Sequence, residues 1–296
     1  MNRTKKIIIT VLVAIVVVAG IIVANIKHRN SPLKDIKVTI DYAGNDPLVV
    51  SETIVAQIQN AFPTMVGRPL KEVDKNSVEQ IVADNPYVKE SHASISLGGS
   101  LMVRCIERTP IVHVYLPLSA RQAQKFDAYV LKLRGQNAEN VPLRSARIVE
   151  FYLDEEGRFM PMSSDGYSYV IVANGVFREY ANKGCALFDV EQLQHSKNFA
   201  QSDLVSAWKL ALFLHQNPIY GDLMDQIFVD NRGDLQVSPL VGNHIVVVGS
   251  AENLDEKFLD LLSFYRNGME KVGWDAYKQI NLKYKNQVIC TKRTNR

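Results

Sequence analysis

Residues 85–110, NPYVKESHASISLGGSLMVRCIERTP, predict two strands joined by a glycine turn. Apolar and polar residues alternate in both arms, and Gly98-Gly99 separates them. Side chains on a strand alternate between two faces, and a two-glycine turn is a favoured hairpin loop. The pattern therefore predicts a hairpin with one apolar face, which other elements must cover. That face is built from Ala93, Ile95, Leu97, Leu101, Val103 and Cys105.

The elements that could cover this face lie immediately upstream. Residues 36–40 alternate and predict a strand, while residues 51–62 and 74–84 carry apolar residues at helical spacing. Asp74 fits the N-cap of the second helix; a capping box formed by Ser77 and Gln80 is the alternative. The order strand, helix, helix, strand, strand predicts a small domain over residues 34–109.

The N-terminus contains an uncharged apolar run over residues 7–26. A helix rises about 1.5 Å per residue, so this run matches the roughly 30 Å hydrocarbon core of a bilayer. Cleaved signal peptides usually carry a shorter apolar region of about 7–15 residues. We therefore predict a retained transmembrane helix over residues 7–26, with a cleaved signal peptide as the alternative. Residues 1–6 would be a short cytoplasmic tail, although the basic residues flanking the span nearly balance.

Composition limits the remaining possibilities. The chain has 296 residues, 47% of them hydrophobic, and a net charge of +3, which allows roughly two domains and gives no basic stripe for nucleic acid. Cys105, Cys185 and Cys290 are odd in number and widely spaced, which excludes a disulfide framework. We expect Cys105 and Cys290 to be small buried hydrophobes, with a single disulfide as the alternative.

After Pro110 the pattern predicts a larger, mostly β domain over residues 110–292, followed by a tail at 293–296. Residues 154–157 and 231–234 form expected turns, and helices are expected to begin at Ser202 and at a capping box of Asn253 with Glu256. The chain is expected to close with a hairpin of strands at 279–284 and 287–291. Residues 117–147 are rich in Arg and Lys and are expected to form an exposed basic insertion.

Several stretches resemble one known family. Residues 85–90 and 106–110 resemble the POTRA-type module of the bacterial cell-division protein FtsQ, called DivIB in other lineages. Residues 152–157 are similar to the Leu-Asp-x-x-Gly turn of its second domain, and residues 280–284 to its closing strand. Two features depart from the family pattern: Asn286-Gln287 replaces a usual glycine, and residues 117–147 are longer than the connection needs. The predicted fold class is α+β: one transmembrane helix, a POTRA-like β-α-α-β-β module and a larger mixed-strand β domain with packed helices.

A search for catalytic patterns finds no metal, phosphate-loop, dinucleotide or serine-hydrolase motif. His244 at a strand start is interpreted as a hydrogen-bonding histidine. The carboxylates Asp154, Glu155 and Glu156 are interpreted as solvated residues of a turn rather than a catalytic group, because consecutive carboxylates point to different sides. Trp274 is expected to be a core or capping residue, with an interface as the alternative. We therefore expect no catalytic residue, no cofactor and no metal.

The resemblance implies a non-enzymatic scaffold of the cell-division machinery in the inner membrane, at the septum, with its C-terminal body in the periplasm. It implies FtsB and FtsL as partners, with FtsW- and FtsI-type synthesis proteins as further candidates, and neither nucleic acid nor a small-molecule substrate. It also implies that the partner adds a strand at the C-terminal edge. The expected contact residues are Lys283, Tyr284, Lys285, Gln287, Val288 and Ile289. The alternatives are a POTRA-bearing component of secretion or outer-membrane assembly, and an anchored periplasmic hydrolase.

Overall fold

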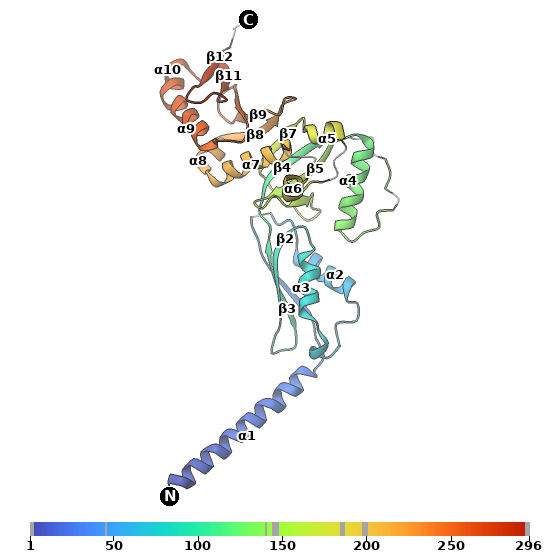
Figure 1. The fold of residues 1–296 in the computed structure, drawn as a ribbon. Helices are drawn as coiled ribbons and strands as arrows, with labels where there is room; N and C mark the ends of the chain where they lie inside the picture. Colours follow the sequence, from blue (N-terminus) through green and yellow to red (C-terminus); the bar gives the residue numbers. More distant parts are fainter. Residues whose placement is uncertain are drawn as a thin grey trace. The chain divides into compact units, whose positions relative to one another are not determined.

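The computed structural model describes residues 3–44, 46–139, 141–143, 148–183, 187–196 and 201–293 (Figure 1). The chain divides into two compact units, residues 1–107 and 108–296. Each unit combines a β-sheet with helices, so the α+β fold class predicted from the sequence is confirmed.

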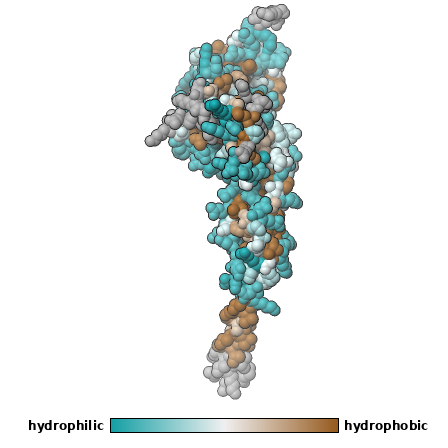
Figure 2. All heavy atoms as spheres, turned by 90° about the vertical axis from the view of Figure 1, so that its right-hand side faces the viewer, coloured by the Kyte–Doolittle hydropathy of each residue, from teal (hydrophilic) through white to brown (hydrophobic). Residues whose placement is uncertain are grey.

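The first unit begins with the helix α1, Arg3–Arg29. Residues 10–29 form a segment that can cross a membrane by its length and composition, and none of its residues is buried. Figure 2 shows the apolar side chains of α1 as a brown band. Contiguous apolar surface of this kind is unfavourable in water, because it is stabilised only when another apolar phase covers it. The predicted span, residues 7–26, lies within this helix.

A three-stranded sheet with the order β1-β3-β2 forms the rest of the first unit. β1 (Ile36–Asp41) runs parallel to β3 (Leu101–Glu107), and β2 (Val88–Ile95) runs antiparallel to β3. The helices α2 (Ser51–Ala61) and α3 (Lys75–Ala83) contact the sheet, and the short η1 (Leu70–Glu72) lies between them in the sequence. The order of elements agrees with the order predicted from the sequence.

The predicted hairpin with one apolar face is confirmed. Leu101, Val103 and Cys105 are buried at alternate positions of β3, and Ala93 is buried on β2. Leu97 differs from the expectation, because it lies in the turn and is 94% exposed. The core they share with the helices contains Ile54, Ile58, Val78 and Val82.

Two carboxylates, one buried and one exposed, hold backbone N–H groups in this unit. The Glu107 carboxylate is buried and accepts hydrogen bonds from the backbone N–H of Leu48 at 2.6 Å and of Ala43 at 3.1 Å. It therefore ties the loop before α2 to the end of β3. The Asp74 carboxylate accepts from the N–H groups of Asn76 and Ser77 and caps α3, which confirms the N-cap.

The second unit contains a nine-stranded mixed sheet with the order β12-β11-β10-β9-β8-β7-β4-β5-β6. β4 pairs parallel to β7, β7 to β8, and β10 to β11, while the other pairs are antiparallel. Its strands are β4 (Pro110–Pro117), β5 (Ile148–Asp154), β6 (Phe159–Pro161), β7 (Ile171–Gly175), β8 (Met224–Val229), β9 (Leu235–Pro239), β10 (Ile245–Gly249), β11 (Tyr277–Asn281) and β12 (Ile289–Lys292).

Helices of the second unit share one apolar core with this sheet, and Figure 1 shows α9 and α10 near β11 and β12, with α4 and α5 at the other end. Alternate strand residues such as Val114, Ile227, Val246 and Ile280 belong to the core. The helices are α4 (Ala120–Leu133), α5 (Arg178–Lys183), α6 (Val190–His195), α7 (Asp203–Gln216), α8 (Pro218–Gly221), α9 (Leu254–Phe264), the π-helix η2 (Tyr265–Met269) and α10 (Glu270–Val272).

The segment 117–147 is not simply an exposed basic insertion. Its residues 120–133 form α4, which begins at a capping box of Ser119 with Gln122. Ala123 and Phe126 lie one helical turn apart and are buried, and the Phe126 ring is 5.0 Å from that of Phe188. The helix is amphipathic, so its basic residues stay outside while one face joins the core. Arg144 and Arg147 lie outside the described residues.

The expected capping box of Asn253 and Glu256 is also wrong. Asn253 precedes α9 with φ 53° and ψ 41°, and its side chain caps no N–H group. An N-cap side chain reaches the first turn from an extended backbone, whereas Asn253 adopts the left-handed conformation. Asn253 therefore supplies the left-handed residue of the tight turn between β10 and α9.

The cysteines follow the expectation where they are described. Cys105 is buried and Cys290 is half-buried, and both are free thiols. Burial raises the pKa of Cys105 to about 11, as expected for an inert core thiol. Cys185 lies outside the described residues.

Candidate functional site

β12 forms one edge of the nine-stranded sheet and pairs on one side with β11. Cys290 is opposite Ile280, and Ile289 is opposite Asn281. The opposite edge, β6, is three residues long, entirely buried and ended by Pro161, which cannot donate to a ladder. An edge strand presents unpaired N–H and C=O groups to another chain. Between the two edges of this sheet, β12 is therefore the better template.

One backbone hydrogen bond indicates which groups of β12 face outward. The Arg293 N–H donates to the Ala276 carbonyl at 3.0 Å, so Arg293 turns its N–H toward the β11 side. Successive N–H groups of an antiparallel strand point to alternate sides. The N–H groups of Lys292 and Cys290 therefore point away from β11.

The six predicted contact residues do not all lie on a strand. β11 ends at Asn281 rather than at residue 284, and β12 begins at Ile289 rather than at residue 287. Asn281 ends β11 because its side-chain oxygen accepts from the Lys283 N–H at 2.9 Å, as in an Asx turn. Consequently Lys283, Tyr284, Lys285 and Gln287 lie in the connection between the two strands.

Of the other two predicted residues, Val288 immediately precedes the edge strand and Ile289 begins it. Val288 is half-buried against the core, and Ile289 is the first residue of β12 with 45% of its surface exposed. The structure thus brings Val288 and Ile289 to the edge, with the four connection residues beside its beginning.

Lys283 is already engaged within the second unit. Its ammonium group forms an ion pair with Asp234, which follows the β8–β9 turn. Its stem packs over Gly249, where a Cβ would lie 2.7 Å from Lys283 Cγ. Lys283 therefore links the β11–β12 connection to the β8–β9 turn through Asp234. The sequence did not predict this role.

The departure at Asn286-Gln287 is accommodated in the backbone. Asn286 has φ 58°, in the left-handed region where glycine is usual and where asparagine is tolerated. The Gln287 N–H donates to the Tyr284 carbonyl at 3.2 Å and closes the turn. The hairpin therefore forms without a glycine.

The segment of the chain that carries this edge is basic. Residues 266–293 contain seven Lys and Arg against two acidic residues, and all nine are exposed. A local excess of positive charge attracts an acidic partner and accelerates its association. The basic residues are Arg266, Lys271, Lys278, Lys283, Lys285, Lys292 and Arg293, and the acidic ones are Glu270 and Asp275.

His244 is a structural residue near the same end of the sheet. It is 2% exposed, its Nε2 lies 2.8 Å from the Tyr265 hydroxyl, and its ring stacks on Trp274. Burial lowers the pKa of His244, and the Arg293 cation lowers it further. The interpretation of His244 as a hydrogen-bonding histidine at a strand start is confirmed.

The acidic turn at residues 154–157 is organised by Asp154. The Asp154 carboxylate is buried, accepts from the N–H groups of Glu156 and Arg158, and pairs with the Arg108 guanidinium at 2.7 Å. Its carbonyl accepts from the Trp208 indole N–H at 2.9 Å. The carboxylate therefore holds the turn, and Asp154 is buried rather than solvated as predicted from the sequence.

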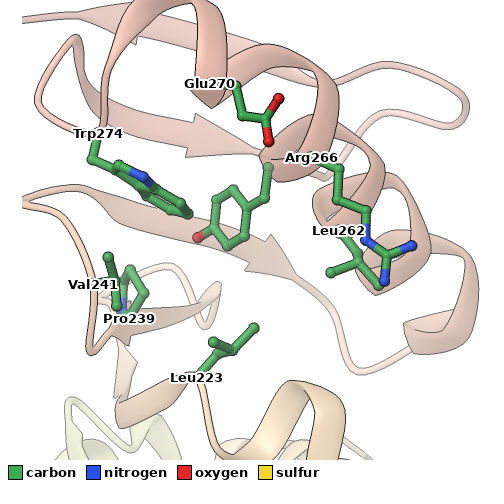
Figure 3. Close-up of a pocket in the computed structure, with 8 residues that line it drawn as sticks. Leu223, Pro239, Val241, Leu262, Arg266, Glu270 and Trp274 are labelled. Atoms are coloured by element: carbon green, nitrogen blue, oxygen red, sulfur yellow. The ribbon is translucent and has the colours of Figure 1, made fainter.

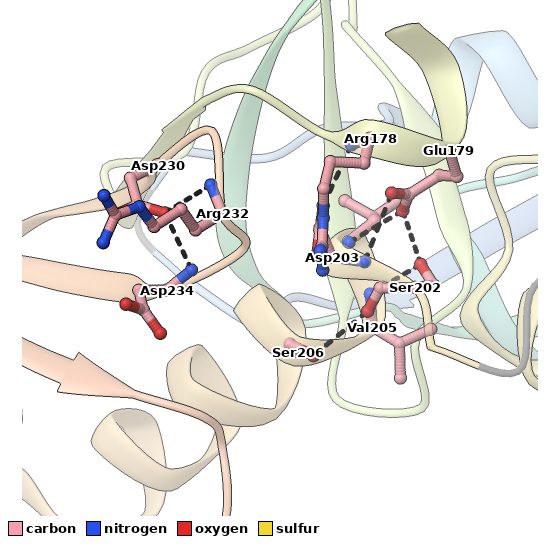
Figure 4. A network of polar contacts seen from close by, with 10 residues as sticks. Arg178, Glu179, Ser202, Asp203, Val205, Ser206, Asp230, Arg232 and Asp234 are labelled. Atoms are coloured by element: carbon pink, nitrogen blue, oxygen red, sulfur yellow. Dashed lines mark hydrogen bonds and ion pairs between the residues drawn. The ribbon is translucent and has the colours of Figure 1, made fainter. Parts of the chain in front are cut away.

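A second polar network holds the start of α7, as Figure 4 shows. The Glu179 carboxylate accepts from the Ser202 hydroxyl at 2.5 Å and from the Leu204 N–H at 2.9 Å. The Asp203 carboxylate accepts from the Arg178 guanidinium at 2.6 Å. Carboxylates at a helix N-terminus satisfy its free N–H groups and complement its dipole. The role of Glu179 could not be predicted from the sequence, because Ser202 lies more than twenty residues away.

Comparison with known proteins agrees with this architecture. The family model FtsQ/DivIB, C-terminal related, matches residues 143–291, which is half of the chain and includes β5 to β11 and most of β12. No curated protein matches the sequence. The matched region contains the Asp154 turn, the α7 network and the C-terminal hairpin described above. The chain therefore belongs to the FtsQ/DivIB family of cell-division proteins.

Proposed function

We propose that this protein is a non-enzymatic, bitopic scaffold of the division machinery, anchored in the inner membrane by α1. Family membership supports a role in cell division, and the exposed apolar surface of α1 supports a single membrane span. In this proposal residues 1–6 are cytoplasmic and the remainder is periplasmic, so that the protein acts at the septum. Residues 34–109 are the POTRA-like domain, supported by their strand-helix-helix-strand-strand order. Residues 110–292 are the partner-binding β domain.

The edge strand β12 is the proposed docking site for FtsB, which would arrive paired with FtsL. The observation that carries this proposal is the position of β12 at the edge of the sheet, with N–H groups pointing outward. An added strand would take its affinity from backbone hydrogen bonds and its specificity from side chains on either side. FtsW- and FtsI-type synthesis proteins would be assembled around the same scaffold.

The connection residues have distinct proposed roles. Ile289 and Tyr284 are exposed and would contact apolar side chains of the partner. Lys285 would select acidic residues, and Lys283 would act mainly by fixing the loop through Asp234. Gln287 and Val288 would set the start of strand pairing.

A pair of variants at one position tests strand addition. Lys292→Pro removes an outward N–H group, whereas Lys292→Ala removes the same charge and keeps the N–H. We expect Lys292→Pro to weaken binding of the purified FtsB–FtsL complex to the full chain by at least about tenfold, because the lost ladder bond is compounded by the steric block of the ring. Lys292→Ala should weaken it only slightly.

The same binding assay can refute the proposal. If Lys292→Pro retained the wild-type thermal unfolding midpoint and bound FtsB–FtsL as tightly as Lys292→Ala, strand addition at β12 would be wrong. In cells, the tagged protein should gather at mid-cell and co-purify with FtsB and FtsL. Uniform distribution along the membrane would contradict the division role.

A further inference from the structure

A pocket of about 390 Å³ lies beside the π-helix η2 (Figure 3). Apolar and aromatic side chains dominate its lining, and this volume is within the range of about 300–1,000 Å³ that is typical of ligand pockets. The lining includes Leu223, Pro239, Val241, Leu262, Tyr265 and Trp274.

The π-helix shapes one wall of this pocket. Figure 3 shows Leu262, Arg266 and Glu270 on one side, with Leu223, Pro239 and Val241 opposite and Trp274 beside them. A π-helical turn is a rare insertion in a helix and is found frequently at functional sites. Here it buries Tyr265 and Met269 in the core while Arg266 and Glu270 remain exposed at the pocket.

The apolar lining reaches the surface. Val241 is 48% exposed and Trp274 is 38% exposed, and the neighbouring Leu240 is also exposed. Binding energy at protein interfaces concentrates where a large apolar side chain of one partner fills a concave, aromatic-lined pocket of the other. The pocket has the shape and chemistry of such an anchor site.

The residue after β12 contacts two segments that carry pocket residues. Arg293 follows the last residue of β12, and its N–H donates to the Ala276 carbonyl, two residues after Trp274. Its guanidinium also donates to the Asn243 carbonyl, two residues after Val241. Val241 and Trp274, which line the pocket, therefore each lie two residues from a carbonyl group that Arg293 contacts. A chain paired with β12 would reach the pocket as it leaves the sheet.

We propose that this pocket holds one large apolar side chain, aromatic or aliphatic, of the same acidic segment that pairs with β12. The inference rests on the proposed strand addition and extends it by an anchor beyond the strand. The basic segment 266–293 contains β12 and part of the pocket lining, and its excess of positive charge favours acidic residues next to the anchor. The partner segment would thus combine an extended stretch, acidic side chains and one apolar anchor.

Binding of purified FtsB–FtsL to the full chain in nanodiscs tests the anchor. Val241→Asp places a negative charge at the pocket, and Trp274→Ala removes one wall. The matched control is Val176→Asp, since Val176 is another exposed valine that is absent from the pocket lining. We expect each pocket variant to weaken binding by at least about tenfold, as for an interface hot spot, and the control to bind like the wild type. Thermal unfolding identifies any variant that has lost its fold, and Val241→Asp, at a half-exposed position, provides the test if Trp274→Ala unfolds.

The Lys292→Pro variant separates the two proposals. If Lys292→Pro weakens binding while a folded Val241→Asp binds like the wild type, the anchor is overturned and strand addition stands. If Val241→Asp weakens binding while Lys292→Pro does not, the pocket is a docking site and strand addition is overturned. Wild-type binding by both variants overturns both proposals. If Val241→Asp abolished self-association of this chain but left partner binding intact, the anchor would also be overturned, because the pocket would then join two copies of this chain.

Discussion

Arg108 and Asp154 form a buried ion pair in which the guanidinium Nη1 donates to the carboxylate Oδ2 at 2.7 Å. Both side chains are largely withdrawn from water. The pair joins the beginning of the second unit to the β5–β6 turn. Because the same carboxylate also holds two N–H groups of the turn, its loss would leave several groups unsatisfied.

Removal of this carboxylate should therefore be costly. We expect Asp154→Ala to lower the free energy of unfolding by roughly 3–5 kcal/mol, the usual cost of leaving one charge of a buried pair alone. Glu156→Ala serves as the control, since Glu156 touches the same Arg108 group but is half exposed, and should cost less than about 1 kcal/mol. Denaturant unfolding of the full chain in detergent measures both. Equal losses would contradict the role of Asp154 in the turn.

The glycine of the same turn has no room for a side chain. Gly157 has φ 75°, and a Cβ there would lie 2.5 Å from the Val190 Cβ. Gly135 has φ 67° but open space around it, so it isolates the backbone cost. We expect Gly135→Ala to cost about 1 kcal/mol and Gly157→Ala roughly 1–3 kcal/mol more, because α6 must shift. If the two variants unfolded at the same denaturant concentration, the packing of Val190 against Gly157 would be wrong.

The packing of α4 predicts a large effect at Phe126. Its ring lies 5.0–6.0 Å from the rings of Phe188, Phe159 and Phe151. We expect Phe126→Ala to cost roughly 3–5 kcal/mol, as for other buried aromatic residues. Lys125→Ala, on the exposed side of the same helix, should change stability by less than about 0.5 kcal/mol. A small effect of Phe126→Ala would restore the interpretation of residues 117–147 as an exposed insertion.

Stability should depend on pH through His244. Its pKa is lowered in the folded protein by burial and by Arg293, while Asp275 opposes the shift. As the pH falls below the unfolded pKa of histidine, about 6.5, the unfolded protein binds a proton at this residue before the folded protein does. The stability that neutral His244 contributes at higher pH is therefore lost as the pH falls toward its folded pKa. His244→Gln should therefore show a shallower loss of unfolding free energy between pH 7.5 and 5 than the wild type. An unchanged slope would contradict this assignment, and the exposed His195→Gln controls for removing a histidine.

The sequence predicted the elements whose signals are local. The alternation in β3, the Asp74 cap and the glycine turn after Asp154 each depend on residues within a few positions of one another. The same holds for the C-terminal hairpin, although its strand ends were displaced because the Asn281 side chain forms an Asx turn.

Contacts between distant residues could not be predicted in this way. Glu179 accepts a hydrogen bond from Ser202 at the start of α7, and Lys283 forms an ion pair with Asp234. Neither contact produces a periodic pattern in the sequence. Asn253 misled the prediction because asparagine serves both as an N-cap and as a left-handed turn residue. At the proposed site the sequence therefore predicted the edge strand but not the pocket beside η2, whose walls come from four separate segments.

Hydrogen exchange of the full chain, measured with and without bound FtsB–FtsL, tests the central claim most directly. If the partner adds a strand to β12, the outward N–H groups of Cys290 and Lys292 become paired and should exchange at least about tenfold more slowly in the complex. The amides of β6 at the other edge should be unchanged. Protection elsewhere in the second unit, with Cys290 and Lys292 exchanging at their unbound rates, would contradict docking at this edge.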